Sequence, residues 1–369
     1  MGIAGLVAVT GCTSAGGARG QLQPAATLPP LLPVAAQANV RAADAALADT
    51  LDSELAGEEY ERLRSLVILS SGRTVYERYF HSAPTAQHEV FSVTKSLTGI
   101  LMGIAIGEGL IDGVDQTLAS LLPDRAAGMS PEVAQATLEQ VLTERAGLSD
   151  ESPVDAAEQT GDWLGALLVN PVGAPGAGFH YSDASLALLS AILVRVTGRS
   201  VLAYAREKLF DPLGIALSPF AQVDAWQRAG SIDGAGIGVG VYLTGSDIGS
   251  SRLRLTGQDM AKLGLLMLQD GSWEGRQVVP AQWVRQATTT HADTGAFQVG
   301  YGYQWWTGRT SEGDSTFYAL GAGQQTILVV PDRQLVVAYQ LWLPESGDAS
   351  VGALVRELIA TTVRPALSR

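Results

Sequence analysis

The sequence predicts an α+β fold in which an antiparallel sheet, flanked by helices, carries an inserted helical lobe. Apolar, β-branched segments typical of strands occur towards both ends of the chain, whereas the stretch from about residue 97 to 215 shows mainly helical periodicity. The chain has 369 residues, of which 46% are hydrophobic and 17% charged, a composition typical of one large folded body. We therefore expect the two ends of the chain to build one sheet between them.

The first twelve residues resemble a truncated lipoprotein signal. Their apolar run ends in Val9-Thr10-Gly11-Cys12, similar to the lipobox in which a cysteine becomes lipidated. The run lacks a basic start and is too short to span a membrane, so a plain unstructured N-terminus is the alternative. Residues 13–43 are rich in Ala, Pro and Gly and are predicted to be a flexible tether. We expect an exported protein, held peripherally at the cell envelope by a lipid on Cys12, on the periplasmic or extracellular face.

The remaining residues, 44–369, are predicted to form the folded domain. A helix is expected in AADAALADTLDSELAG, followed by a hairpin in SLVILSSGRTVYERYF that turns at Ser71-Gly72. The helical lobe contains SVTKSLTGILMGIAIGEG, TLEQVLTERAG with a stop at Gly147, SDASLALLSAILVRVTG with a stop at Gly198, and VLAYAREKLF. Further helices are expected in TGQDMAKLGLLMLQDG and VVPAQWVRQAT, strands in YGYQWW, QTILVVP and QLVVAYQLW, and a closing helix in VGALVRELIATTV.

Charge and rare residue types exclude several classes of protein. A formal net charge of -13 makes nucleic acid a poor partner, because phosphate binding relies on clustered Lys and Arg. Cys12 is the single cysteine, so an internal disulfide is excluded. Only three of the 24 basic residues are lysines, Lys95, Lys208 and Lys262. Because lysine, unlike arginine, can lose its proton in a protein, a lysine at a chemically suggestive position is a candidate functional residue.

Ser92 and Lys95 form the first such position. Their i, i+3 spacing at the start of the helix that follows Phe91 places both side chains on one face. Free backbone N–H groups there favour a developing oxyanion, and the apolar flank LTGILMGIAI favours a buried lysine. The alternative is an N-cap serine and a solvated lysine. Against it, a lysine in the first turn opposes the helix dipole, and the helix is too apolar for the surface.

Two further segments contain candidate residues. In Tyr181-Ser182-Asp183, which precedes an apolar helix, the phenol of Tyr181 could accept a serine proton if a lysine stabilised its ionised form. Tyr181 as a core residue, with Ser182 or Asp183 as the N-cap, is the alternative. In Gly321-Ala322-Gly323 the backbone can approach a ligand closely, so N–H groups of the following strand could form an oxyanion hole. An ordinary hairpin entry is the alternative there.

Other catalytic or ligand-binding motifs are absent or incomplete in the sequence. His88-Glu89 lacks the second histidine of HExxH, and no G-x-S-x-G elbow, phosphate loop or dinucleotide fingerprint is present. We therefore expect no metal and no organic cofactor. His180 beside Tyr181 is interpreted as structural. Trp305 and Trp306 are candidates for lining a substrate cleft, with core packing of at least one as the alternative.

Together and in this order, the three segments resemble the serine hydrolases of the class C β-lactamase and penicillin-binding-protein-like family. The family includes esterases, DD-peptidases and 6-aminohexanoate-dimer hydrolases, and the resemblance covers most of residues 60–345. It implies a β-lactamase/transpeptidase-like fold with the active site between the two lobes. Ser92 would be the acylated nucleophile, Lys95 its partner and Tyr181 the general base. Backbone N–H groups of Ser92 and of Gln325 or Gln324 would hold the oxyanion, with Gly323 and Asp183 beside them.

The sequence departs from the family pattern at two positions. Asp183 stands where the family's Tyr-x-Asn motif has an amide, which favours a charged Lys95. Ser182-Asp183 also resembles the start of a Ser-Asp-Asn motif, in which the serine would replace Tyr181; this interpretation is less favoured. Ala322 stands where β-lactamases and DD-peptidases carry Lys or His, so a charge-assisted contact of about 1.5–3 kcal/mol to a substrate carboxylate is missing.

The predicted function is hydrolysis of a small ester or amide through an acyl-enzyme on Ser92. The Ala322 form of the third segment is similar to the esterase and 6-aminohexanoate-oligomer-hydrolase branch of the family. Two alternatives remain: β-lactamase or DD-peptidase activity, and a penicillin-binding-like fold retained as an inactive sensor or scaffold.

Overall fold

The computed structural model describes residues 42–148, 162–169, 171–216, 253–296, 298–342 and 350–367. The lipobox-like segment with Cys12 and almost all of the predicted tether lie outside these residues. Within them, no single helix is long and apolar enough to cross a membrane, although the bent pair Asp183–Thr197 and Val201–Phe210 meets that test by length and composition.

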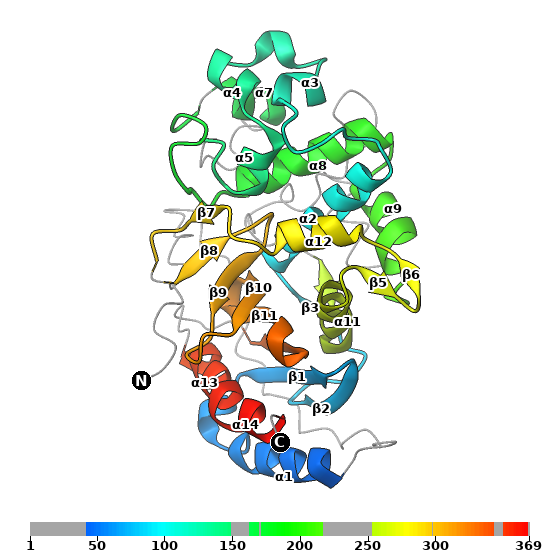
Figure 1. Cartoon of the computed structure of the whole chain (residues 1–369), viewed down its shortest axis with the longest axis vertical. Coiled ribbons are helices and arrows are strands. Elements are labelled where there is room, and N and C mark those ends of the chain that lie inside the picture. Colours follow the sequence, from blue (N-terminus) through cyan, green and yellow to red (C-terminus); the bar gives the residue numbers. More distant parts are fainter. Residues whose placement is uncertain are drawn as a thin grey trace, which may run out of the picture.

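An antiparallel sheet of eight strands, in the order β2-β1-β12-β11-β10-β9-β8-β7, forms the centre of the molecule (Figure 1). Its first strand, β1 (Leu63–Ser70), pairs with its last, β12 (Leu335–Leu341), which confirms that both ends of the chain build it. The other strands are β2 (Arg73–Tyr79), β7 (Ala292–Asp293), β8 (Val299–Tyr301), β9 (Trp306–Arg309), β10 (Ser315–Gly321) and β11 (Gln325–Val330). Two small sheets pair β3 (His88–Glu89) with β4 (Arg254–Leu255) and β5 (Ser272–Trp273) with β6 (Arg276–Gln277).

Both faces of this sheet are covered, which explains why β12 is apolar along almost its whole length. Val337 and Tyr339 pack towards α1 (Ala42–Glu54) and α13 (Ser350–Leu358), whereas Val336 and Ala338 pack towards α11 (Gly257–Leu268) on the opposite face. Side chains alternate between the faces of a strand, so a strand covered on both sides is apolar at nearly every position; the exception in β12 is the buried Gln340. Full burial of one such side chain contributes about 1.5–3 kcal/mol.

The helical lobe is inserted between the strands of the two chain ends. Figure 1 shows α3, α4, α5, α7 and α8 gathered at the end of the molecule remote from β1 and β2. The helices of this part are α2 (Val93–Gly107), α3 (Leu118–Leu121), α4 (Pro131–Gln135), α5 (Leu138–Leu142), α7 (Trp163–Val169), α8 (Asp183–Thr197) and α9 (Val201–Ala205), which continues as a π-helix (Arg206–Phe210). The predicted stop of α8 at Gly198 is confirmed, because this residue adopts the left-handed φ of +65°.

The apolar helix α2 lies between the lobe and the sheet. Its residues Val93 to Ala105 are all buried, and it contacts both α8 and β10. From the other side, α12 (Ala281–Ala287) places the Trp283 indole against it, where Nε1 donates to the Gly99 carbonyl at 3.0 Å. A Cβ at Gly103 would lie 2.1 Å from the Trp283 ring, so this close approach requires glycine. The sequence prediction of a buried helix is confirmed.

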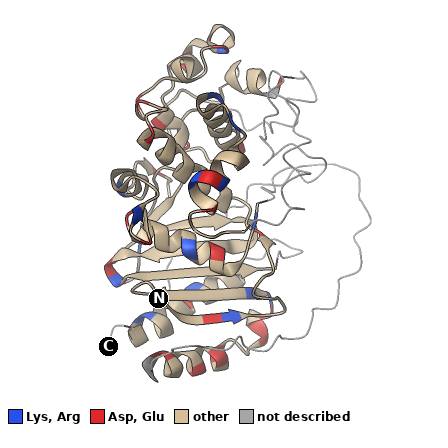
Figure 2. Ribbon diagram, turned by 90° about the vertical axis from the view of Figure 1, so that its right-hand side faces the viewer, with Lys and Arg blue, Asp and Glu red and all other residues tan. Residues whose placement is uncertain are grey.

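The remaining described segments are short. They are the 3-10 turns Glu58–Tyr60, Ala126–Gly128, Ala322–Gln324 and Pro331–Arg333, the π-helix Ile359–Val363 that extends α13, and α14 (Arg364–Leu367). Charged residues are spread over many elements in the ribbon of Figure 2, with acidic residues along α1 at the bottom.

Two predicted elements differ from the structure. YGYQWW is not one strand: β8 ends at Tyr301 and β9 begins at Trp306, and the connection contains Gln304 at φ +64°. TLEQVLTERAG does not remain helical to Gly147, because α5 ends at Leu142 and Glu144 adopts φ +57°. A left-handed residue cannot continue a right-handed helix, so the chain turns there.

Candidate active site

Ser92 occupies the N-cap position of α2. It follows Phe91, whose φ of +48° is in the left-handed region that non-glycine residues adopt at an energetic cost. Phe91 and Val93 are buried, whereas Ser92 between them is partly exposed. Within the described chain its side chain makes no capping hydrogen bond; its hydroxyl is instead hydrogen-bonded to Tyr181. The interpretation of Ser92 as a simple helix cap therefore does not hold.

Lys95 lies one turn further along α2 and is only 1% exposed. Its ammonium donates to the Ser182 carbonyl at 2.9 Å and to Asp183 Oδ1 at 2.8 Å. Lys95 Nζ also lies 4.6 Å from the centroid of the Tyr181 ring. The packing of α2 against α8 thus brings together Ser92 and Lys95 with the three residues 181–183, and the solvated-lysine alternative is excluded.

The start of α8 holds Tyr181 in place. The side chain of Ser182 caps this helix by accepting a hydrogen bond from the Ala184 N–H at 3.0 Å, so it is occupied structurally. On its other side, the Tyr181 ring stacks on Trp306 with 5.5 Å between the ring centroids. Burial raises the pKa of Tyr181 to about 12, although the Lys95 charge and the hydrogen bond from Ser92 act in the opposite direction. Tyr181 is therefore a phenol at neutral pH, beside a cation that stabilises its anion.

Glu144 is a site residue that our sequence reasoning missed. It is fully buried, and its Oε2 accepts a hydrogen bond from the Ser182 N–H at 3.2 Å. Burial raises its pKa to about 7, against the opposing effects of the Lys95 charge and of hydrogen bonds with Ser185, Ser182 and Gln304. Lys95 consequently interacts with two carboxylates, those of Asp183 and Glu144. The surrounding sequence, TLEQVLTERAG, contains other polar and charged residues as well, so no signal in it distinguishes Glu144.

Gln304 connects Glu144 to α2. Its Nε2 donates to Glu144 Oε1 at 3.3 Å and to the Leu142 carbonyl at 3.0 Å. Its own carbonyl accepts a hydrogen bond from the Ser96 hydroxyl at 2.6 Å. Gln304 is buried and has a left-handed backbone. Its hydrogen bonds with Ser96 and Leu142 therefore hold α2 against the end of α5.

The glycine turn lies directly against the residues that precede Ser92. A Cβ at Gly321 would lie 2.2 Å from the Val90 carbonyl oxygen and 3.2 Å from Phe91 Cβ, so only glycine fits there. Gly323 and Gln324 follow with φ of +68° and +69°, and Ala322 is exposed. The structure therefore places the third predicted segment beside Ser92.

The two glutamines of this turn use their side chains for the scaffold. Gln325 is buried and donates to the Leu341 carbonyl at 2.9 Å, while its own oxygen accepts the Leu341 N–H at 3.2 Å. Gln324 Oε1 accepts a hydrogen bond from Arg356 at 2.9 Å. Their backbone N–H groups are thus the atoms to which an oxyanion role can be assigned, and that role stays a prediction.

The side chains of Trp305 and Trp306 lie in different parts of the structure. Trp306 contacts Tyr181, as described above. Trp305 is 1% exposed and lies edge-on to Phe317, with 5.5 Å between the ring centroids, in the hydrophobic core. Trp305 is therefore a packing residue, and Trp306 is the tryptophan beside the candidate site.

The described residues contain no group of three or more His, Cys, Asp or Glu side chains with the geometry to hold a metal ion. His180 belongs to the scaffold through its backbone, since its N–H donates to the Glu144 carbonyl at 2.7 Å.

Comparison with known proteins gives a consistent relationship. A 6-aminohexanoate-dimer hydrolase from Paenarthrobacter ureafaciens is 28% identical over 294 residues, which cover 72% of this chain and 69% of the relative. The crystal structure of a penicillin-binding-protein homologue from Caulobacter crescentus superposes with a TM-score of 0.66 at 19% identity, covering 88% of this chain and 99% of that one. A D-stereospecific amidohydrolase from Streptomyces sp. superposes with a TM-score of 0.64 at 18% identity, covering 86% and 99%.

These two superpositions support the predicted β-lactamase/transpeptidase-like fold. The model of the family described as Beta-lactamase matches residues 63–360, which include α2, the start of α8 and the turn at Gly321. The chain belongs to the β-lactamase family.

Proposed function

We propose that this protein is a serine hydrolase that cleaves a small carboxylic ester or a linear amide through an acyl-enzyme on Ser92. One observation supports it above all others. Ser92 is partly exposed, and among the described residues its hydroxyl makes no capping hydrogen bond. The hydroxyl is hydrogen-bonded to Tyr181, whose ring lies beside the buried Lys95 ammonium. A weak nucleophile with an adjacent base held by a cation is the arrangement that covalent catalysis requires.

The proposed reaction has two halves. The first half starts from the phenolate form of Tyr181. Ser92 Oγ attacks the substrate carbonyl while its proton passes to the Tyr181 oxygen, and Tyr181 then protonates the leaving alcohol or amine. In the second half Tyr181, again a phenolate, takes a proton from a water molecule, whose oxygen attacks the ester carbonyl on Ser92. The bond between Ser92 Oγ and the acyl group then breaks, Tyr181 returns the proton to Ser92 Oγ, and the acid leaves. Lys95 stays charged between Asp183 and the Tyr181 ring and stabilises the phenolate. Backbone N–H groups of Ser92 and of Gln325 or Gln324 would hold the oxyanion.

The turn argues for a substrate without an essential carboxylate. Ala322 is exposed at the position where a cation would bind the carboxylate of a β-lactam or a stem peptide, and it supplies no charge. The related 6-aminohexanoate-dimer hydrolase acts, by its name, on a linear amide, so short linear amides are included in the proposed substrate class. β-Lactamase or DD-peptidase activity is the second candidate, favoured by family membership alone.

The test uses a fluorophosphonate probe, p-nitrophenyl acetate, the 6-aminohexanoate dimer and nitrocefin. We expect labelling and turnover of the ester or the amide in the native chain, and neither in Ser92→Ala. Ser120→Ala is the matched control, because Ser120 is an exposed serine in the first turn of α3. Labelling that persists in Ser92→Ala rejects the proposal, and nitrocefin turnover well above ester turnover favours the second candidate.

We also propose that the protein is exported and held at the cell envelope by a lipid on Cys12. The lipobox-like sequence supports this. Expression of the native chain and of Cys12→Ala with a radiolabelled fatty acid tests it: we expect label and membrane association that the variant loses. An unlabelled native chain in the aqueous fraction would rule the anchor out.

A further inference from the structure

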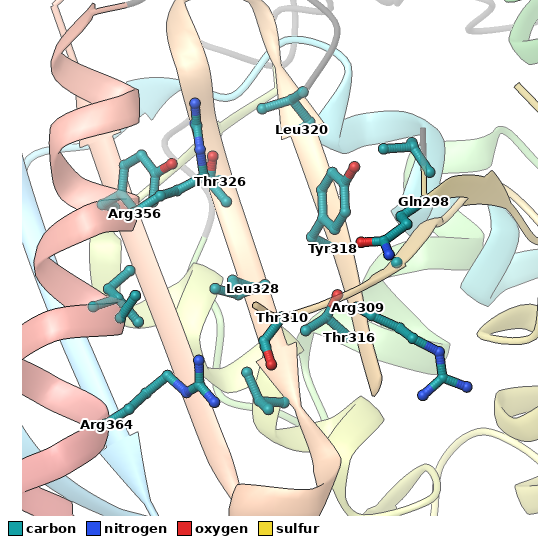
Figure 3. A pocket seen from close by; sticks show the side chains of 16 residues that line it. Gln298, Arg309, Thr310, Thr316, Tyr318, Leu320, Thr326, Leu328, Arg356 and Arg364 are labelled. Carbon is teal, nitrogen blue, oxygen red and sulfur yellow. The ribbon is translucent and has the colours of Figure 1, made fainter. Parts of the chain in front are cut away.

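A cavity lies behind the aromatic residues of the candidate site, separate from Ser92. It has a volume of about 70 Å³ and lies between strands β9 to β12 and the helical segment 350–364 (Figure 3). Ser92, Lys95 and Tyr181 are not among the described residues that line it. The ring of Tyr318, which does line it, stacks on Trp306, and Trp306 stacks on Tyr181. One aromatic layer therefore separates this cavity from the catalytic cluster.

The lining of the cavity is mainly apolar, with one cation of particular interest. Leu320, Leu328, Val330 and Ile359 supply apolar walls. Arg356 is half-buried at the wall, and its hydrogen-bond partner is the neutral side-chain amide of Gln324. Among the described residues no carboxylate pairs with Arg356. A partly desolvated cation without a counter-ion attracts an anion more strongly than one in water.

The other arginines of the cavity are differently placed. Arg364 is ion-paired with Glu312 and Asp314, so its charge is already compensated. Arg309 is exposed, and its guanidinium donates to the Gly313 carbonyl at 2.8 Å. Figure 3 shows Arg356 and Arg364 extending from the helical side towards the strands. Arg356 is therefore the residue available to an incoming anion.

Two tyrosine hydroxyls lie near this cation. The Tyr339 hydroxyl is buried and, within the described chain, has no hydrogen-bond partner, which is costly for a polar group. Burial and the nearby Tyr339 raise the pKa of Tyr318, whereas the Arg356 charge lowers it, so all three groups are within electrostatic reach of one another. A carboxylate could accept hydrogen bonds from such hydroxyls as well as from the guanidinium.

We propose that this cavity is a second binding site, for a short amphipathic monocarboxylate, with its carboxylate on Arg356 and its carbon chain against Leu328 and Ile359. About five to seven water-sized spheres fit in this volume, which suits a chain of a few carbons. Such an acid could be free in the medium or be the acid product of the proposed hydrolysis. The site itself does not require catalysis.

The test is calorimetric titration of the full chain with hexanoate, hexanol and acetate. Ser92→Ala is the reference protein, because it cannot generate an acid product. We expect hexanoate to bind, and hexanol and acetate to bind at least about tenfold more weakly, since each lacks either the charge or the chain. Absence of hexanoate binding, or equal binding of hexanol, overturns the proposal. A separate measurement on the native chain during ester turnover distinguishes the two sources of the acid. Acid that stays bound after turnover and is then released is the reaction product, whereas acid that binds only when it is added comes from the medium.

Variants locate the bound acid. In the Ser92→Ala background, Arg356→Gln should weaken hexanoate binding about tenfold or more. Leu328→Trp should abolish it by filling the cavity, and Tyr339→Phe should weaken it by a smaller factor. Arg195→Gln, at an exposed arginine of α8 that pairs with Asp124, is the matched control and should bind normally. Circular dichroism establishes that each variant is folded. Unchanged binding in Arg356→Gln, or loss of binding once a fluorophosphonate occupies the active site of the native chain, overturns the proposal.

Discussion

The candidate catalytic cluster around Ser92 and the turn from Gly321 to Gln325 differ in how they use their side chains. Ser92, Lys95, Tyr181 and Asp183 act through their side chains, which are linked by an ion pair, hydrogen bonds and a ring contact. In the turn from Gly321 to Gln325 the two glutamine side chains are used by the scaffold, and Ala322 is exposed. The comparison teaches that the cluster offers side chains and the turn offers backbone atoms. Under the proposed function, the chemistry would depend on the side chains of the cluster, and substrate choice on the turn and its exposed position 322.

The largest expected effect comes from removing the buried cation. Lys95→Met should lower kcat/KM for the ester by about 10⁴-fold or more, because residues that act as a unit lose nearly everything when one is removed. Lys262→Met is the control, since Lys262 is a partly exposed lysine on α11. If Lys95→Met retained a tenth of the native activity, the cluster would not be the catalytic unit.

Tyr181→Phe should lower kcat/KM by about 10³-fold, the usual contribution of a general acid–base group. In the native chain, the pKa of about 12 means that the phenolate fraction rises about tenfold per pH unit throughout the neutral and mildly alkaline range. The native pH profile should therefore still be rising at about pH 9–10. A profile that levels off near neutrality would contradict this role, and Tyr204→Phe, remote from the site, is the control.

The turn at Gly321 should tolerate no larger side chain without a loss of activity. Gly321→Ala should lower kcat/KM by about 10–100-fold, because its Cβ would push the turn away from Val90 and misplace the backbone relative to Ser92. It should also cost about 1–3 kcal/mol of unfolding free energy from overpacking. Ala322→Ser, one residue further and exposed, should change neither quantity. Equal effects at the two positions in kinetics and urea unfolding would contradict the close contact.

Much of this architecture could be predicted from the sequence, because it depends on local patterns. The hairpin at Ser71-Gly72, the stop at Gly198 and the buried helix after Ser92 each follow from residues close in sequence. Glu144 and Gln304 could not be predicted in this way. Both residues have a left-handed backbone, and their partners are far apart in the chain: Glu144 accepts a hydrogen bond from the Ser182 N–H, and Gln304 donates to Glu144. Trp305 and Trp306 are adjacent in sequence yet separate for the same reason.

Ala322→Lys should restore recognition of a substrate carboxylate. We expect kcat/KM for an anionic substrate to rise about tenfold, the value of one charge-assisted contact, with little change for a neutral ester. The ratio of the two rates is the measurement. A parallel change in both rates would show that position 322 does not select between them.

The smallest effect on activity is expected from Glu144→Gln, a few-fold, while its effect on pH-dependent stability is clearer. Because the folded pKa of about 7 lies above the ordinary value of 4.5, the stability that protonated Glu144 contributes is present below about pH 4.5 and is lost as pH rises to about 7. Urea unfolding of the native chain should show this loss, on the order of 1–3 kcal/mol, and Glu144→Gln should not. Glu132→Gln, at an exposed carboxylate, should behave like the native chain. The same change of unfolding free energy with pH in all three proteins would refute the prediction.

The pairing of the first strand with the last has a consequence for how the chain folds. β1 cannot complete its place in the sheet until β12, some 270 residues later by its register with Ser65 and Gln340, is available. Loop closure over such a distance is slow, and folding rates fall as contacts become less local. The helical lobe can gain its local structure earlier, but the surface on which α2 rests is finished last. A chain shortened before Leu335 should therefore leave β1 and β11 without the strand between them and weaken the sheet against which α2 packs, although Ser92, Lys95 and Tyr181 would all still be present.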